Sequence, residues 1–311
     1  GIHLTPQLFR LLGPQAETAL QKVGLQGTLF PREMKFVFDM PTNRLARLSG
    51  NGGSARIEDF SMTGPPEIQD AFGEITFGTL QWEDKVGIHT DLALHEGRGE
   101  LFDLPFSNAT GALTITPEKL RWTDFNMNLL EGVLEMAPPP DDSGKDYSGG
   151  ILLGLSADAP MSADLSFKNL QLKRLQEDLQ LGTPLQGNVS GVLRITSSTP
   201  NPLDYEGTGE VYIKNGRLSA VPILSELWAT LGIRPPIFRK GTMKLQFEKN
   251  GNIRVEDFSL DHDLMEVQGK GLLRMDQSVE IQITIRKMMF LLGLPLEMIP
   301  GLDYVFDLFV K

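Results

Sequence analysis

The sequence contains no cysteine, and this absence excludes disulfides, thiol catalysis and thiolate metal sites. It has only four histidines, and none has a partner at a spacing typical of a metal site. No serine lies in a nucleophile elbow, and no serine, histidine and carboxylate form a recognisable catalytic set. The sequence therefore predicts a protein that is not an enzyme and that needs no metal or cofactor.

Positive charge and long apolar runs are also scarce. Lysine and arginine total 29 against 40 acidic residues, which gives a net charge of −11. Nucleic-acid binding requires a basic surface, so we expect no nucleic-acid partner. The longest strongly apolar run, Met288 to Leu296, has nine residues, which is too short to span a bilayer.

Apolar and polar residues alternate with a period of two along much of the chain, which predicts β-strands with one apolar face. The clearest runs are 243–247 and 279–285, and Asn250-Gly251 predicts a hairpin turn. The 32 glycines and 20 prolines are typical of many short strands joined by turns. Further strands are expected within 25–40, 88–94, 111–116, 164–167 and 189–195.

Helical patterns are fewer and shorter. We expect two helices within 5–24, one from Leu172 to Gly182 and one ending at Gly232. Near the end of the chain, Ile299, Leu302, Phe306 and Phe309 share one helical face, so this segment is predicted to be an amphipathic helix.

A repeated motif indicates a duplicated strand unit. Glu96-Gly-Arg-Gly-Glu100 recurs as Glu206-Gly-Thr-Gly-Glu210, and tetrapeptides of similar sequence follow each copy. These are Asp124-Phe-Asn-Met127 and Asp257-Phe-Ser-Leu260, with a third at Asp59-Phe-Ser-Met62. No helix pattern follows the motif's glycines, so they predict close strand packing or a bulge, not a nucleotide-binding loop.

The one-sided strands leave more apolar surface than the few helices can cover. Repetition of a unit along one sheet lengthens the sheet without closing it. We therefore predict a mainly β protein with a few short α-helices, in which a long twisted antiparallel sheet of repeated strand units forms an open apolar groove. A closed β-sandwich remains the alternative. The expected divisions are 1–136, a flexible loop at 137–150, and 151–311.

Several segments in the second half of the chain share patterns of glycine and apolar residues: 163–179, 184–195, Glu206 to Leu218, Val221 to Leu227 and Gly269-Lys-Gly271. These segments resemble the C-terminal region of AsmA-like proteins, and the resemblance covers about 163–310. It implies a periplasmic envelope protein of diderm bacteria that carries phospholipid acyl chains in a repeating β-groove. It also implies an N-terminal inner-membrane anchor, which is absent from this chain, and partners among envelope or membrane proteins.

The expected function is thus non-enzymatic binding and transfer of phospholipid or another acyl lipid, in support of outer-membrane biogenesis. The alternative is a structural or protein-interaction module of the envelope with a closed core. The predicted groove-lining residues are Leu193, Ile195, Met243, Leu245, Phe247, Ile281, Ile283 and Ile285. The residues predicted to cover or end the groove are Leu224, Leu227, Trp228, Leu302 and Phe306.

Overall fold

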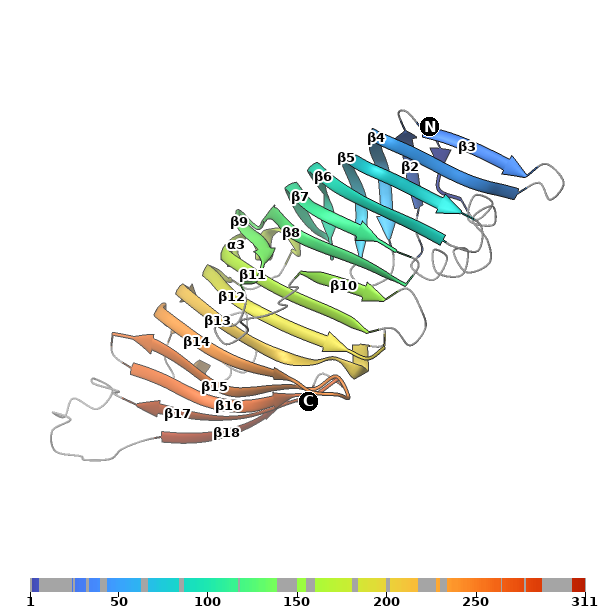
Figure 1. Ribbon diagram of the computed structural model, residues 1–311. Helices are drawn as coiled ribbons and strands as arrows, with labels where there is room; N and C mark the ends of the chain where they lie inside the picture. Colours follow the sequence, from blue (N-terminus) through green and yellow to red (C-terminus); the bar gives the residue numbers. More distant parts are fainter. Residues whose placement is uncertain are drawn as a thin grey trace. The chain divides into compact units, whose positions relative to one another are not determined.

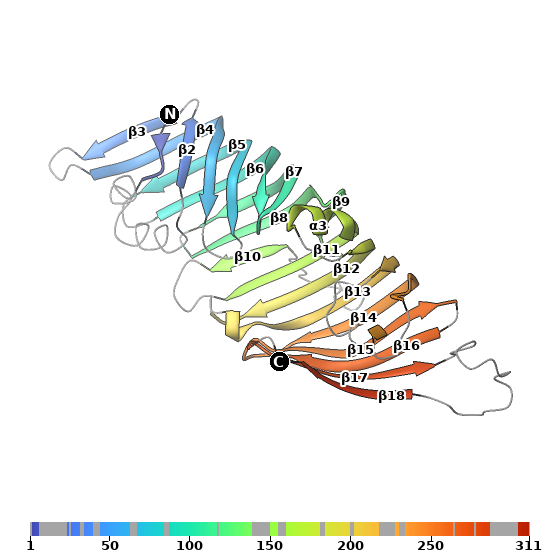
Figure 2. The same cartoon turned by 180° about the vertical axis from the view of Figure 1, so that it is seen from behind.

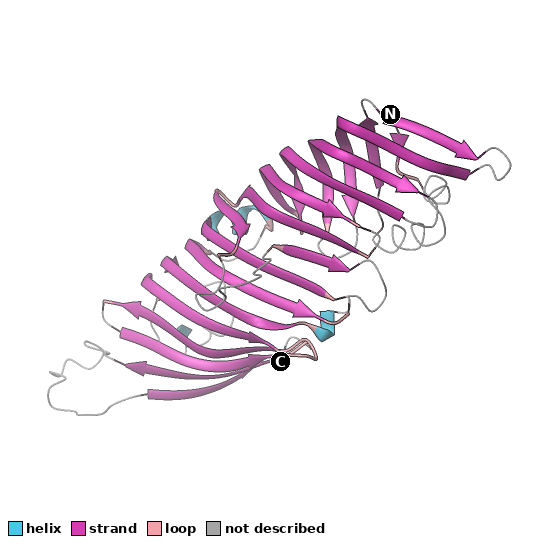
Figure 3. Ribbon diagram, viewed as in Figure 1, coloured by secondary structure: helices cyan, strands magenta, loops and turns pink. Residues whose placement is uncertain are grey.

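The structure is a computed structural model of the chain, and strands dominate it, as predicted (Figure 3). Among the described residues, α3 (Leu172–Asp178) is the only α-helix for which both ends are described. The chain divides into unit 1, Gly1–Ala163, and unit 2, Asp164–Lys311. The described residues are 2–5, 24, 26–31, 34–39, 44–62, 67–83, 87–116, 118–138, 150–154, 160–180, 184–199, 202–217, 228–229, 234–263, 265–276, 278–286 and 304–310.

Unit 1 is an antiparallel sheet built around five consecutive strands, β4 to β8. At one edge, β3 and β2 pair with successive parts of β4, and at the other edge β10 and β9 pair with successive parts of β8. Figures 1 and 2 show this unit from opposite sides. The strands are β1 (Ile2–His3), β2 (Gln26–Pro31), β3 (Met34–Asp39), β4 (Arg44–Met62), β5 (Ile68–Glu83), β6 (Gly87–Leu101), β7 (Leu104–Ile115), β8 (Lys119–Leu129), β9 (Gly132–Met136) and β10 (Ile151–Gly154).

A row of β-bulges crosses the long strands of unit 1. One residue in each strand from β4 to β8 has a positive φ between 47° and 52°, and the strand register shifts beside these residues. A bulge bends its strand and increases the local twist, so an aligned row bends the whole sheet. We call these residues the bulge row: Asp59, Asp70, Glu96, Asn108 and Asp124.

Glu96 offers a direct test of the bulge row. Its φ of 51° lies in the left-handed region, where a Cβ atom costs about 1 kcal/mol and a β-branched side chain costs more. We expect Glu96→Gly to be at least as stable as the wild type and Glu96→Val to lose about 1–2 kcal/mol. Equilibrium denaturation of both variants measures this. Glu100→Gly, on the same strand, should be destabilising, and a Glu96→Val variant more stable than Glu96→Gly would contradict the assignment.

Unit 2 is also a single antiparallel sheet, in which each strand from β11 to β18 neighbours the next. The described strands of this unit therefore do not form a sandwich of two sheets. Besides α3 and the short 3-10 helix η1 (Pro202–Asp204), its elements are β11 (Met161–Gln171, of which 164–171 lie in unit 2), β12 (Gln186–Ser197), β13 (Glu206–Arg217), β14 (Phe238–Phe247), β15 (Ile253–His262), β16 (Met265–Leu273), β17 (Val279–Arg286) and β18 (Tyr304–Val310).

The two ends of the unit 2 strands are connected differently. At one end, which we call the turn edge, short segments join β12 to β13, β14 to β15 and β16 to β17. At the other end, the loop edge, the longer segments 172–185, 218–237 and 287–303 join the strands, together with the short turn from β15 to β16. In Figure 1 the turns that follow β14 and β16 lie near the chain end marked C.

Several local predictions can be compared with the structure. The hairpin at Asn250-Gly251 is confirmed: β14 and β15 pair antiparallel through the connection 248–252, and both residues have a positive φ (92° and 75°). The helix expected at 172–182 is present as α3, which begins at Leu172 and already ends at Asp178. The two helices expected within 5–24 lie almost entirely outside the described residues, and of the helix ending at Gly232 only 228–229 are described, as helical.

The predicted C-terminal helix is wrong for residues 304–310, which form strand β18. Tyr304, Phe306, Leu308 and Val310 alternate with a period of two, and they pair in register with Ile285, Ile283, Ile281 and Val279 of β17. Phe306 and Phe309 also fit the helical face predicted with Ile299 and Leu302, so the local pattern is compatible with either structure. The strand prevails because the backbone groups along β17 gain hydrogen-bond partners.

Candidate functional site

The sheet of unit 2 has one polar and one apolar face. On the polar face the register aligns Glu210 with Lys244, and Lys244 with Asp257, which places opposite charges side by side. The Tyr212 hydroxyl donates a hydrogen bond to Glu210 (2.9 Å), and this bond raises the pKa of Tyr212. The other face carries leucine, isoleucine, valine, methionine and phenylalanine. The candidate site lies on this apolar face.

Near the loop edge the apolar face is covered. Ten side chains there are at most 8% exposed, and Val267, Ile283 and Ile285 are at 0%. Trp228 and Phe238 belong to the same group, with ring centroids 5.9 Å apart. We call this group the covered cluster: Leu185, Ile213, Trp228, Phe238, Phe258, Leu260, Met265, Val267, Ile283 and Ile285.

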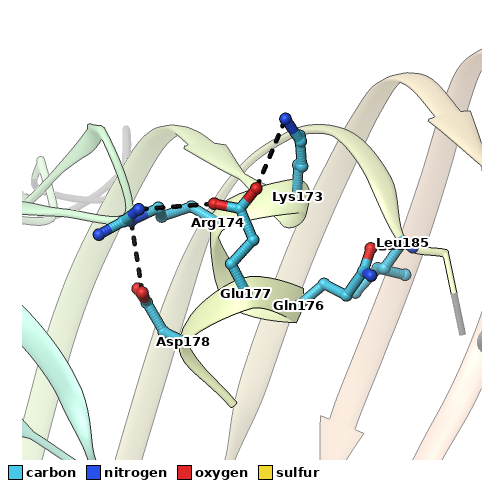
Figure 4. Close-up of polar contacts among 6 residues, drawn as sticks. All are labelled: Lys173, Arg174, Gln176, Glu177, Asp178 and Leu185. Atoms are coloured by element: carbon cyan, nitrogen blue, oxygen red, sulfur yellow. Dashed lines mark hydrogen bonds and ion pairs between the residues drawn. The ribbon is translucent and has the colours of Figure 1, made fainter. Parts of the chain in front are cut away.

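Helix α3 is attached to the covered cluster at the loop edge. Leu172 and Leu175 pack against the cluster, and the backbone N–H of Leu185 donates a hydrogen bond to Gln176 Oε1 (2.9 Å; Figure 4). The charged side chains of the helix pair with one another: Lys173 and Arg174 each lie 3.4 Å from Glu177. These exposed pairs contribute little stability, so apolar packing is the main reason that the helix stays on the sheet.

Toward the turn edge the same apolar face is only partly covered. We call this region the half-buried patch, because each of its side chains is intermediate in exposure. The register places its members on β12, β14 and β15, with Gly207 and Gly209 of β13 between those of β12 and β14. The half-buried patch consists of Leu193, Ile195, Leu245, Phe247 and Ile253.

The glycines of the repeated motif allow close packing at this patch. A Cβ on Gly209 would lie 2.7 Å from Leu193 Cδ2, and a Cβ on Gly207 would lie 2.8 Å from the Cα of Ile195. In the first copy a Cβ on Gly97 would lie 2.9 Å from the Cβ of Ala109. The prediction that these glycines serve close strand packing is therefore confirmed, and β13 contributes a strip without side chains to the patch.

Unit 1 also has an apolar face that is partly covered. Phe77 is 4% exposed and Phe125 2%, but Ile75, Leu92 and Leu113 are half-buried. The opposite face is polar, with His95 hydrogen-bonded to Thr76 (3.0 Å) and Thr114 donating to Asp91 (2.7 Å). Both units thus combine a polar face with an apolar face that retains exposed surface.

The predicted groove-lining residues fall into three environments. Leu193, Ile195, Leu245 and Phe247 belong to the half-buried patch, whereas Met243 and Ile281 are half-buried but pack against the covered cluster. Ile283 and Ile285 lie within the covered cluster. The prediction did not include Ile253, although the strand that follows the Asn250-Gly251 turn could have indicated it.

The residues predicted to cover or end the groove lie in different parts of the structure or outside the described residues. Trp228 is 2% exposed and lies in the covered cluster. Phe306 is on β18 opposite Ile283. Leu224, Leu227 and Leu302 lie outside the described residues.

The described ranges contain neither a cluster of metal ligands nor a membrane-spanning helix. Within them, no three or more histidine, aspartate or glutamate side chains gather where they could hold a metal ion. No helix among the described residues is both long and apolar enough to cross a membrane. No protein family, curated protein or solved structure matches the chain.

Proposed function

We propose that this protein is a non-enzymatic lipid-binding and lipid-transfer protein of the AsmA-like kind, which holds acyl chains against the apolar faces of its sheets. In this proposal it works in the periplasm, anchored to the inner membrane in its full-length form, and it serves outer-membrane biogenesis. Phospholipid or another acyl lipid is the cargo, and envelope or membrane proteins are partners.

The observation that carries the proposal is the change in burial along one face of unit 2. The covered cluster is closed to solvent, yet the half-buried patch on the same strands keeps large aliphatic and aromatic side chains partly in water. Each buried methylene of a ligand contributes about 0.8 kcal/mol. A bound acyl chain would therefore shield the side chains of the half-buried patch from water, as neighbouring side chains already do in the covered cluster.

The strip at Gly207 gives a position for such a chain. The register places Ile195 on one side of Gly207 and Phe247 on the other, and neighbouring strands lie about 4.8 Å apart. An acyl chain over Gly207 would contact both side chains while meeting no side chain from β13. Hydrocarbon contacts of this kind bind without chemical specificity, which suits a carrier of varied acyl lipids.

The covered cluster supports a second candidate function. A structural or protein-interaction module also needs a closed apolar core, and the covered cluster supplies one in unit 2. The two candidates differ at the half-buried patch, because only the lipid-binding function needs apolar side chains there. Substitutions at the patch therefore discriminate between them.

We expect Phe247→Asp and Ile195→Asp each to lower the affinity for a fluorescent fatty acid by at least about tenfold, because a carboxylate loses apolar contacts with the chain. The matched controls are Gln246→Asp and Thr196→Asp, which place the same charge on the polar face of the same strands. Titration of the four variants measures the affinity, and organic extraction with mass spectrometry tests for lipid that co-purifies with the wild type.

Circular dichroism shows whether each variant is folded before its affinity is compared. Equal affinity in the patch variants and their controls would contradict the lipid-binding function and favour the interaction module. The absence of both fatty-acid binding and co-purified lipid from the wild type would have the same meaning.

A further inference from the structure

The turn edge of unit 2 carries an exposed apolar patch that the half-buried patch does not include. Leu203, Leu273 and Met275 are 41%, 38% and 55% exposed, and we call these three residues the tip patch. Leu203 lies in η1, Leu273 ends β16, and Met275 lies in the turn that follows. Exposed aliphatic side chains that gather at neighbouring turns often mark an interaction site, whereas isolated ones are common on any protein surface.

The turns that carry the tip patch are joined to one another. The backbone N–H of Asn250 donates a hydrogen bond to the Leu203 carbonyl (2.5 Å), which ties the turn between β14 and β15 to η1. A Cβ on Gly251 would lie 3.2 Å from Leu203 Cδ2 and 2.5 Å from Met275 Cγ. The side chains of Leu203, from η1, and of Met275, from the turn after β16, therefore both lie close to Gly251.

The charges around the tip patch leave a small net negative charge. Lys249 pairs with Glu206 (3.1 Å), Arg254 with Glu248 (2.6 Å), and Arg274 with Glu280 (2.5 Å). Two carboxylates add negative charge: Asp276, exposed on the same turn as Met275, and Asp204, which follows Leu203 in η1 and accepts a hydrogen bond from the Thr199 hydroxyl. A surface of this kind has no excess of positive charge to attract anionic lipids, whereas zwitterionic headgroups do not repel it.

The tip patch is continuous with the half-buried patch. Leu273 is in register with Ile253, and Ile253 is in register with Phe247. The apolar face therefore runs from the half-buried patch to the exposed tip without a polar row in between. At the opposite end of the strands the covered cluster closes the same face.

We propose that the tip patch contacts the surface of a zwitterionic lipid bilayer and is the place where an acyl chain passes between the bilayer and the half-buried patch. The second part of this inference rests on the proposed lipid-binding function, but the contact with the bilayer does not. The turn edge is the end of the apolar face that leads to solvent, so it is the end through which a chain can leave.

A bilayer suits the tip patch better than a protein partner does. Its exposed apolar side chains are two leucines and one methionine, whereas energetic centres of protein interfaces are enriched in tryptophan, tyrosine and arginine. A stable protein interface also buries about 800 Å² on each partner, and three side chains on turns provide much less. Shallow insertion into a lipid surface needs only apolar tips of this size.

Single labels can test the contact directly, because the chain has no native cysteine. Met275→Cys and Leu203→Cys, each labelled with an environment-sensitive fluorophore, should brighten severalfold when phosphatidylcholine vesicles are added. The matched control is Ile237→Cys, which is 45% exposed but precedes β14 at the opposite end of the strands. Equal responses at positions 237 and 275 would overturn the proposal.

A double variant separates the bilayer contact from lipid binding. Leu203→Ser/Met275→Ser should reduce the vesicle-bound fraction at least about fivefold in flotation, while the affinity for the fatty-acid probe changes less than about twofold. At low salt, the wild type should bind phosphatidylcholine vesicles better than vesicles rich in phosphatidylglycerol.

The remaining outcomes are also decisive. Unchanged vesicle binding in the double variant would overturn the proposal. So would a self-association, detected by sedimentation, that the double variant abolishes, because the tip patch would then be a contact between copies of this chain. If the wild type binds vesicles through the tip patch but no fatty acid, the bilayer contact stands and the proposed lipid-binding function fails.

Discussion

Ile283→Asp is expected to unfold unit 2. The Ile283 side chain has no exposed surface, and Val267 and Ile285, which are equally buried, belong to the same cluster. A carboxylate at this position would lose its hydration without gaining a partner, which costs several kcal/mol. Because domains have total stabilities of about 5–15 kcal/mol, one such change can remove most of the folded state. Circular dichroism and denaturant unfolding of the full chain measure the loss.

The neighbouring residue provides the control for this substitution. Gln282 lies on the opposite face of β17 and stands opposite Lys270, so Gln282→Asp should change stability by no more than about 0.5 kcal/mol. Ile283→Val should cost about 0.5–1.5 kcal/mol. An Ile283→Asp variant that keeps the wild-type free energy of unfolding would show that the covered cluster is not closed to water.

Gly207→Ala is expected to lower the free energy of unfolding by about 3 kcal/mol. The added Cβ would lie 2.8 Å from the Cα of Ile195 and would also meet the carbonyl oxygen of Arg194. Both are backbone atoms of β12, so they cannot move aside without displacing a hydrogen-bonded strand. Equilibrium denaturation measures the loss, which should be present without any added ligand.

Two other glycines calibrate this effect. A Cβ on Gly78 would meet no atom within 4 Å, so Gly78→Ala should be neutral or stabilising by up to about 1 kcal/mol. Gly209→Ala should fall between the two, since its nearest neighbour is the end of the Leu193 side chain. If alanine were tolerated equally at 207 and at 78, the motif's glycines would not serve close packing.

The repeated tetrapeptides have a common role in the structure. Asp59 and Asp124 belong to the bulge row, and Asp257 stands beside the register shift between Val255 and Phe258. Phe125 and Phe258, which follow these aspartates, are 2% and 5% exposed. Two copies of the motif thus combine a bulge with a buried apolar anchor, whereas Phe60 of the copy at 59–62 is half-buried; the sequence alone showed only that the pattern repeats.

The local sequence pattern was sufficient to predict structure wherever the backbone conformation depends on a few adjacent residues. The alternation in 243–247 and 279–285 predicted β14 and β17, and Asn250-Gly251 predicted its turn, because strand pleat and positive φ are local properties. The close packing of Gly207 and Gly209 was also predicted, since a glycine within a strand often marks a place where a neighbouring backbone approaches closely.

Burial, by contrast, was decided by the tertiary structure. Leu245 in β14 and Ile283 in β17 both lie on the apolar side of a strand in which apolar and polar residues alternate. Nothing in the residues that flank them predicts a difference in burial. Yet Leu245 is half-buried and Ile283 fully buried, because cover on the apolar face is concentrated near the loop edge. The strand at 304–310 likewise depended on the edge offered by β17. The sequence by itself determined which face of each strand is apolar, and only the tertiary structure decided which part of that face is covered, because cover comes from residues distant in the chain.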